Sequence, residues 1–256
     1  ATGIGQAATL VIYLVVYSTT ESPVHLRRKA LRPDLSLEGR LYAIGVPAIL
    51  NLALPSMLVT FLNGLLAAFS ESYVVVLGIY YKLQTFLYLP ASGIVQGMRP
   101  LIGYNYGARK PDRVKKTIKC AMFYAEAIML VGFLLFQFLP DKLLGLFSAS
   151  EAMLAIGKPA LRIICFHFLL AGMSIILSST FQALGNGMFS LIISVCRQLV
   201  VLLPAAWLLS KTGNVNMVWW SFVIAELVSV TLSFVFFARL DKKIIEPMYD
   251  NAAAAQ

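Results

Sequence analysis

Apolar residues run through this chain in long stretches that short polar segments separate. Seven such stretches cover residues 1–17, 43–68, 73–98, 117–139, 160–182, 187–209 and 216–238. Every stretch after the first reaches the ~20 helical residues that cross a ~30 Å hydrocarbon core. The pattern predicts an all-α integral membrane protein in which only the end of the first helix is present.

Composition agrees with this class. The 256 residues are 59% hydrophobic and only 13% charged, about half the ~25% charged share of soluble domains. The net charge of +9 comes mostly from short loops beside apolar runs, so we expect no nucleic-acid partner. The cysteines Cys120, Cys165 and Cys196 have no CxxC spacing, and the sequence therefore predicts no metal site and no cofactor.

Lysine and arginine alternate between the two sides of the expected bundle. They crowd the loops 18–42 and 99–116 and the tail, whereas the loop 69–72 has none. The positive-inside rule puts the crowded loops and the C-terminus in the cytoplasm. Seven spans then start outside without a basic leader, which argues against a signal peptide. We expect a chain that begins at an even-numbered helix of a longer protein.

The segment from Pro90 to Ala108 mixes apolar residues with two prolines, four glycines, Gln96, Arg99 and Asn105. Glycine and proline are tolerated in membrane helices where neighbouring helices satisfy the freed backbone groups. Polar side chains at that depth favour a protein-lined or wet face over lipid. This mixture is typical of a helix in a polytopic transporter.

Four ionisable residues lie deep in their spans: Glu226, Lys82, Arg197 and Glu126, of which Glu126 could equally be a helix-packing residue. A charge at that depth usually faces the bundle interior or a water-filled cavity. Glu226 is predicted to bind a cation or proton or to attract a cationic substrate; the alternative is a structural ion pair between helices. Lys82 and Arg197 are both candidate partners, and the sequence does not choose between them.

Polar and kink-forming residues make a second candidate set. His167 either relays protons or forms hydrogen bonds between helices. Proline removes a backbone hydrogen bond and kinks a helix, so the span prolines are candidate hinges. The further translocation candidates are Gln84, Asn51 and Asn63, and the candidate hinges are Pro47, Pro55, Pro90 and Pro100.

The string from Gly93 to Ala108 resembles the signature that closes the eighth helix of multidrug and toxic compound extrusion (MATE) transporters. The matching positions are Gln96, Gly97, Pro100, Tyr104, Tyr106, Gly107 and Ala108. Gly45-Val46-Pro47 at the next complete span and the connection Phe181–Asn186 fit the same template, as does Arg197-Gln198 followed by Pro204. The resemblance covers nearly the whole chain and is most like the bacterial MepA-like branch.

The resemblance implies the C-terminal half of a twelve-helix, two-lobe transporter of the cell membrane. The implied function is secondary active efflux of amphipathic cationic drugs, by antiport with H⁺ or Na⁺ and alternating access between the lobes. The N-terminal lobe, the drugs and membrane lipid are the expected partners. The implied parts are the end of the sixth helix (1–17), an inter-lobe loop (18–42), a six-helix lobe (43–240) and a cytoplasmic tail (241–256).

Departures from the family pattern leave the coupling ion open. One branch carries acids on its seventh and tenth helices, at positions that fall near Pro55 and Met173 here. Another branch has its essential carboxylate on a first helix that this chain lacks. The alternatives are a lipid-linked oligosaccharide flippase of the same superfamily and a non-transporting structural subunit. A membrane enzyme is not expected, because the chain has no carboxylate or histidine cluster of the kind that chemistry needs.

Overall fold

The computed structural model describes residues 2–20 and 35–249. Within these ranges, it does not describe the side chains of Thr2 and of seven residues of the second helix: Leu37, Arg40, Ala43, Ile44, Pro47, Ala48 and Leu52. The chain divides into two compact units, Ala1–Tyr42 and Ala43–Gln256. In the first unit, α1 (Thr2–Thr19) is apolar and exposed. Most of the expected loop 18–42 lies outside the described residues.

Six helical stretches are long and apolar enough to cross a membrane. They are Ile49–Ala67, Glu71–Gly107, Pro111–Phe138, Glu151–Ala183, Gly187–Ser210 and Val215–Tyr249. The described residues contain helices and short connections and no strand. The all-α membrane fold predicted from the hydrophobic pattern is therefore confirmed.

The first three of these stretches belong to α2 (Leu35–Ala67), α3 (Glu71–Gly107) and α4 (Pro111–Phe138). Ser70 caps α3 by accepting a hydrogen bond from the backbone N–H of Ser72. Pro111 begins α4 at a position where its missing N–H costs nothing. These local signals fix where each helix starts.

Each of the last three spans contains a departure from α geometry. A 3₁₀ turn, Cys165–His167, joins α6 to α7, and a π segment, Cys196–Leu202, joins α8 to α9. A second π segment, Asp241–Ile245, extends α10. The α-helical parts are α6 (Glu151–Ile164), α7 (Phe168–Ala183), α8 (Gly187–Val195), α9 (Leu203–Ser210) and α10 (Val215–Leu240).

The helices are longer than the apolar runs, and two expected loops are wrong. The loop expected at 99–116 shrinks to Ala108–Lys110, because charged residues leave the apolar core without breaking the helical hydrogen bonds of α3 and α4. Residues 140–159, which connect two of the expected spans and were expected to form a loop, hold α5 (Pro140–Gly145) and the start of α6. Past Leu240, where a tail was expected, the described chain stays largely helical to Tyr249.

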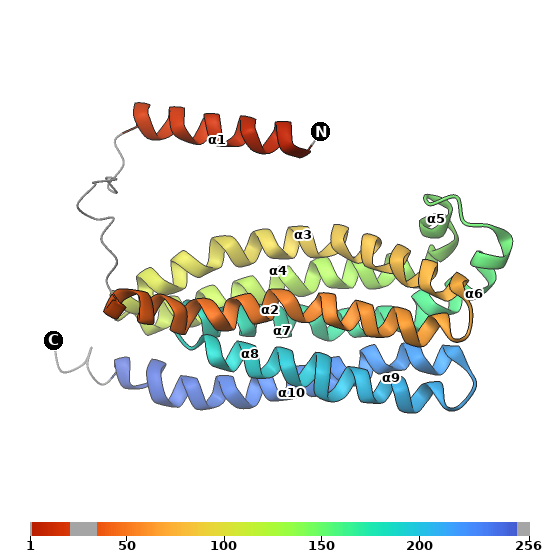
Figure 1. The fold of residues 1–256 in the computed structure, drawn as a ribbon. Coiled ribbons are helices and arrows are strands. Elements are labelled where there is room, and N and C mark those ends of the chain that lie inside the picture. The colour runs from red at the N-terminus through yellow and green to blue at the C-terminus, as the bar shows by residue number, and fades with distance from the viewer. Residues whose placement is uncertain (1, 21–34, 250–256) are drawn as a thin grey trace. The chain divides into compact units, whose positions relative to one another are not determined.

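In the second unit, α3, α4, α7 and α10 lie side by side (Figure 1). The α3–α4 connection, the start of α8 and the end of α10 share one end of the bundle. We call this the basic end, because the connection and the adjoining helix ends carry Arg109, Lys110, Lys115, Lys242 and Lys243. An ion pair of 3.0 Å between Lys115 and Asp241 joins α4 to the extension of α10 there.

The core of the second unit consists of two apolar clusters. One surrounds Trp219, Tyr80 and Phe168, and the other, toward the basic end, surrounds Ile102 and Phe181. Along α10, buried polar residues separate Ala225 of the first cluster from Leu240 of the second. The polar residues are Glu226, Ser229 and Ser233. A polar layer therefore crosses the otherwise apolar lobe.

Candidate functional site

An ion pair forms the centre of the polar layer. Arg197 Nη1 donates to Glu226 Oε2 over 3.1 Å, with side-chain exposures of 29% and 3%. The second carboxylate oxygen, Oε1, is buried without a hydrogen-bond partner. Of the two candidate partners considered from sequence, Arg197 holds Glu226 and Lys82 does not. Arg197 thus balances the charge of the carboxylate but forms a hydrogen bond with only one of its two oxygens.

The π segment of the α8–α9 span carries Arg197. Pro204 follows this segment, and a proline cannot donate to the carbonyl four residues earlier and clashes with it. A wider π turn before the proline relieves that conflict, and such π insertions occur often at functional sites. The local sequence therefore explains why the backbone departs from α geometry where the arginine sits.

His167 lies at the other interruption, the 3₁₀ turn between α6 and α7. Its Nδ1 is 2.6 Å from the carbonyl oxygen of Ile164, so Nδ1 carries the proton and donates. In the neutral ring, Nε2 is then an acceptor. Three groups on α3 lie 3.4 Å from it: the hydroxyls of Tyr80 and Tyr88 and the amide nitrogen of Gln84.

The pair and the histidine line one cavity of about 230 Å³, which we call the tyrosine cavity. Its wall brings together α2, α3, the 3₁₀ turn, the π segment and α10. The lining residues are Pro55, Leu58, Tyr81, Gln84, Tyr88, His167, Arg197, Gln198, Leu202, Phe222, Ala225 and Glu226. Aromatic faces beside one carboxylate make a surface suited to a flat or cationic group.

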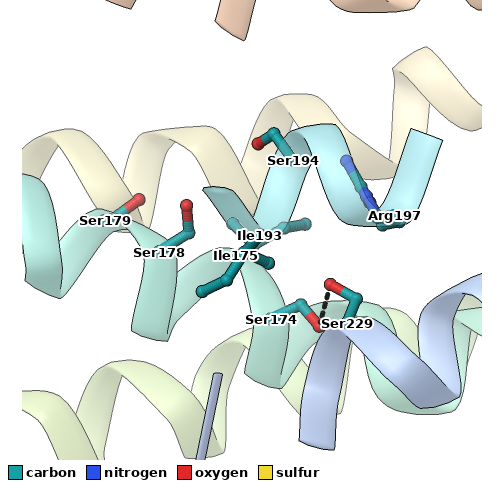
Figure 2. A pocket seen from close by; sticks show the side chains of 8 residues that line it. All are labelled: Ser174, Ile175, Ser178, Ser179, Ile193, Ser194, Arg197 and Ser229. Atoms are coloured by element: carbon teal, nitrogen blue, oxygen red, sulfur yellow. Dashed lines mark hydrogen bonds between the residues drawn. The ribbon is translucent and has the colours of Figure 1, made fainter. Parts of the chain in front are cut away.

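A second cavity of about 150 Å³ lies on the other side of Arg197, and we call it the serine cavity. Figure 2 shows hydroxyls from α7, α8 and α10 around it, with Arg197 at one edge. Its lining is Ser174, Ile175, Ser178, Ser179, Ile193, Ser194, Arg197 and Ser229. Arg197 is common to both cavities.

Some sequence candidates lie apart from this site. Lys82 is exposed, with its ammonium 5.8 Å from the centre of the Phe147 ring. Asn51 and Asn63 are half-buried and line neither cavity, and Oδ1 of Asn51 is buried without a partner. Lys82 therefore does not pair with Glu226 and lines neither cavity, and its role in translocation stays a prediction.

The candidate hinges divide between the cavity and the surface. Pro55 lines the tyrosine cavity, and α3 continues through Pro90 and Pro100 without ending. Pro47 lies within α2, and its side chain is outside the part that the structure describes. The motif residues Gln96, Gly97, Pro100, Tyr104, Tyr106, Gly107 and Ala108 are all exposed. They line neither of the two cavities.

The rows of serine side chains that line one face of α7 and one face of α8 were not identified from the sequence. Ser174, Ser178 and Gln182 recur every four residues on α7, which places them on one helix face. Ser190 and Ser194 do the same on α8. That spacing was the available signal. Within residues 2–20 and 35–249, no cluster of histidine, cysteine and acidic residues fits a metal ion.

Known proteins resemble this chain over most of its length. The family model described as MatE matches residues 47–208. The multidrug export protein MepA of Staphylococcus aureus (strain bovine RF122 / ET3-1) is 26% identical over 88% of this chain and 49% of its own length. MepA of Staphylococcus haemolyticus (strain JCSC1435) is 25% identical over 91% and 51%. The chain thus spans about half the length of these curated relatives.

Solved structures give the same picture. The MATE multidrug transporter DinF-BH, solved in complex with a ligand, superposes with a TM-score of 0.83 at 29% identity, covering 95% of this chain and 55% of that one. An outward-facing multidrug resistance transporter of the MOP superfamily reaches a TM-score of 0.82 at 22% identity, over 95% and 54%. At that identity the second match shows the fold alone.

Proposed function

The chain belongs to the MatE family, and on that premise we propose that it forms the C-terminal lobe of a cation-coupled multidrug exporter. The observation that carries this proposal is the Arg197–Glu226 pair at mid-span beside the tyrosine cavity, in which Glu226 is buried and one carboxylate oxygen has no partner within the protein. The relatives and DinF-BH support multidrug export as the class of activity. The expected N-terminal lobe supplies the other wall of the transport cavity.

The pair explains how an ion gradient drives the exchange. Burying charge inside a membrane lobe is costly, so Glu226 is stable as an anion only while Arg197 compensates it. A proton or Na⁺ at the free oxygen Oε1 adds positive charge and weakens the attraction to Arg197. Arg197 then becomes an uncompensated cation beside the cavity, and it repels a bound cationic drug.

The tyrosine cavity supplies the binding surface in this scheme. The faces of Tyr81 and Tyr88 attract a delocalised cation, and Glu226 attracts its charge. Gln84 and His167 donate or accept hydrogen bonds at the same wall. Drug and coupling ion thus compete for one carboxylate, which is the requirement for antiport. H⁺ and Na⁺ both fit this scheme.

The orientation of the protein is part of the proposal. The basic end of the bundle faces the cytoplasm, in accordance with the positive-inside rule, and the C-terminus lies there too. The cell membrane is the proposed location. The flippase alternative has less support, because the matched relatives are drug exporters and the tyrosine cavity has a single lysine or arginine in its described lining, Arg197.

Drug efflux from cells or proteoliposomes tests the role of Glu226. Glu226→Gln keeps the shape and removes the charge, and we expect efflux of a cationic dye to fall by about tenfold or more and to stop responding to an imposed ion gradient. Glu246→Gln, at the basic end and away from both cavities, is the matched control and should export normally. Unchanged, gradient-driven efflux in Glu226→Gln would refute the proposal.

A further inference from the structure

Polar side chains continue from the Arg197–Glu226 pair toward the basic end of the lobe. Arg197 borders the serine cavity as well as the tyrosine cavity. On the far side of the serine cavity, Ser178 Oγ and Ser190 Oγ are 2.5 Å apart. The polar layer therefore does not end at the ion pair but continues between α7 and α8, along the line where these two helices pack together, which we call the seam.

The last members of this series reach the surface. Gln182 Nε2 donates to Ser190 Oγ over 2.8 Å, and Arg99 Nη2 donates to Gln182 Oε1 over 2.8 Å. Arg99 is exposed on α3, near the basic end. A line of hydrogen-bonded polar groups thus leads from an exposed arginine to the serine cavity, which Arg197 also lines.

The polar residues lie on three membrane-spanning segments, and on each of them they recur every three or four positions. Residues three or four positions apart share a helix face, so each helix presents a polar stripe to the common seam. The stripes are Ser174, Ser178 and Gln182 on α7; Ser190, Ser194 and Arg197 on α8 and the π segment; and Glu226, Ser229 and Ser233 on α10. Ser229 donates to Ser174 over 3.4 Å where two stripes meet.

Two observations separate this seam from ordinary packing of small residues. The serine cavity is partly open and has a volume of about 150 Å³, which is room for several water molecules. Arg197, which holds the buried carboxylate of Glu226, lines the serine cavity as well as the tyrosine cavity. A polar cavity of this size holds water, whereas only apolar cavities stay dry.

We infer that the serine cavity is a water-filled access path within this lobe, through which water passes between the basic end and Arg197 of the Arg197–Glu226 pair. The path deepens the proposed function and rests on it, since it names a route by which water reaches the pair. It lies inside the lobe, along α7 and α8, and meets the pair at Arg197, whereas Glu226 lines the tyrosine cavity. Arg197 separates the two cavities.

Cysteine labelling in membranes that carry the full protein tests the path. The background replaces Cys120, Cys165 and Cys196 by alanine, and a small charged methanethiosulfonate then reports water, because it reacts with thiolates. We expect Ser178→Cys and Ser194→Cys to react about tenfold or more faster than Ser221→Cys. Ser221 is the matched control, a fully buried serine of α10 that lines neither cavity.

Arg99→Cys, at the exposed mouth, is the positive control. If it reacts while Ser178→Cys and Ser194→Cys are as slow as Ser221→Cys, the path does not exist. Slow reaction of Ser221→Cys shows that the cysteine-free background is folded, because this buried position would react quickly in an unfolded protein. Adding Gln182→Leu, which removes the polar link to Arg99, is expected to slow labelling at Ser194→Cys; an unchanged rate would overturn the route through Gln182.

These outcomes are independent of drug export. A reactive serine cavity with normal efflux in Glu226→Gln would overturn the proposed function and leave the path as a hydrated seam. An unreactive cavity with efflux lost in Glu226→Gln would overturn the path alone.

Discussion

A buried carboxylate needs a compensating partner, and in this lobe Glu226 has one for only one of its two oxygens. At the scale of single residues, the two oxygens of this carboxylate therefore have different roles: one contributes to stability through the ion pair, and the other is the candidate for function. Oε2 is held by Arg197, and Oε1 has no hydrogen-bond partner within the protein. A merely structural ion pair in a packed core normally satisfies both oxygens.

Removing one member of the pair is expected to cost more than removing both. Arg197→Met leaves Glu226 as an uncompensated buried anion, and we expect it to lower the free energy of unfolding by about 3 kcal/mol. Arg197→Met combined with Glu226→Gln should recover most of that loss, because no charge then remains buried. Thermal unfolding of the purified protein in detergent measures both. Additive losses in the double variant would contradict this account.

The chemistry of single residues was only partly readable from the sequence. A charge inside an apolar run is visible, so Glu226 and Arg197 could be predicted, and so could His167. Lys82 has the same sequence signal, yet its position on α3 exposes it. Serines within apolar helices are indistinguishable from small packing residues until two helices face each other.

At the scale of elements, close helix packing depends on particular glycines. A Cβ at Gly172 of α7 would lie 2.6 Å from Oε1 and 2.9 Å from the carboxyl carbon of Glu126 on α4. The glycine therefore makes room for a second acidic side chain between the two helices. Glu126 could be found in the sequence, but the glycine that accommodates it lies on a different span, far along the chain.

Gly172→Ala is expected to displace the carboxylate of Glu126, the flexible end of that side chain, and to destabilise the lobe by about 1 kcal/mol, the low end of the cost of overpacking. The midpoint of thermal unfolding in detergent measures this. Gly78→Ala is the control, since a Cβ there meets no atom within 4 Å. Adding Glu126→Ala to Gly172→Ala should restore the midpoint. If Gly78→Ala and Gly172→Ala shift it equally, the close contact is not the cause.

At the scale of the whole molecule, hydrophobic pattern and charge were sufficient to predict six spans and their order. They were insufficient for the lengths of the helices, because hydropathy follows the lipid boundary whereas helical hydrogen bonding continues beyond it. They also could not show which helices pack together. The contact between α7, α8 and α10, which holds the serine cavity, depends on residues far apart in sequence.

The proposed orientation gives a prediction at this scale. In a background without native cysteines, Ser148→Cys, between α5 and α6, is expected to react with a membrane-impermeant maleimide in intact cells. Arg109→Cys, at the basic end, should react only after permeabilisation, because positive loops stay in the cytoplasm. The reverse labelling pattern would show that the proposed orientation is wrong. The path through the serine cavity would then start from the opposite side of the membrane.

The π segment at Cys196–Leu202 has a further consequence for how this chain is compared with its relatives. A π turn arises when a helix accommodates one extra residue. A relative whose corresponding helix is regular would therefore align with this span on only one side of the segment unless a one-residue gap is opened inside it. Sequence columns drawn without that gap would pair Arg197 with the wrong neighbour, so its counterpart in other chains has to be sought by superposition.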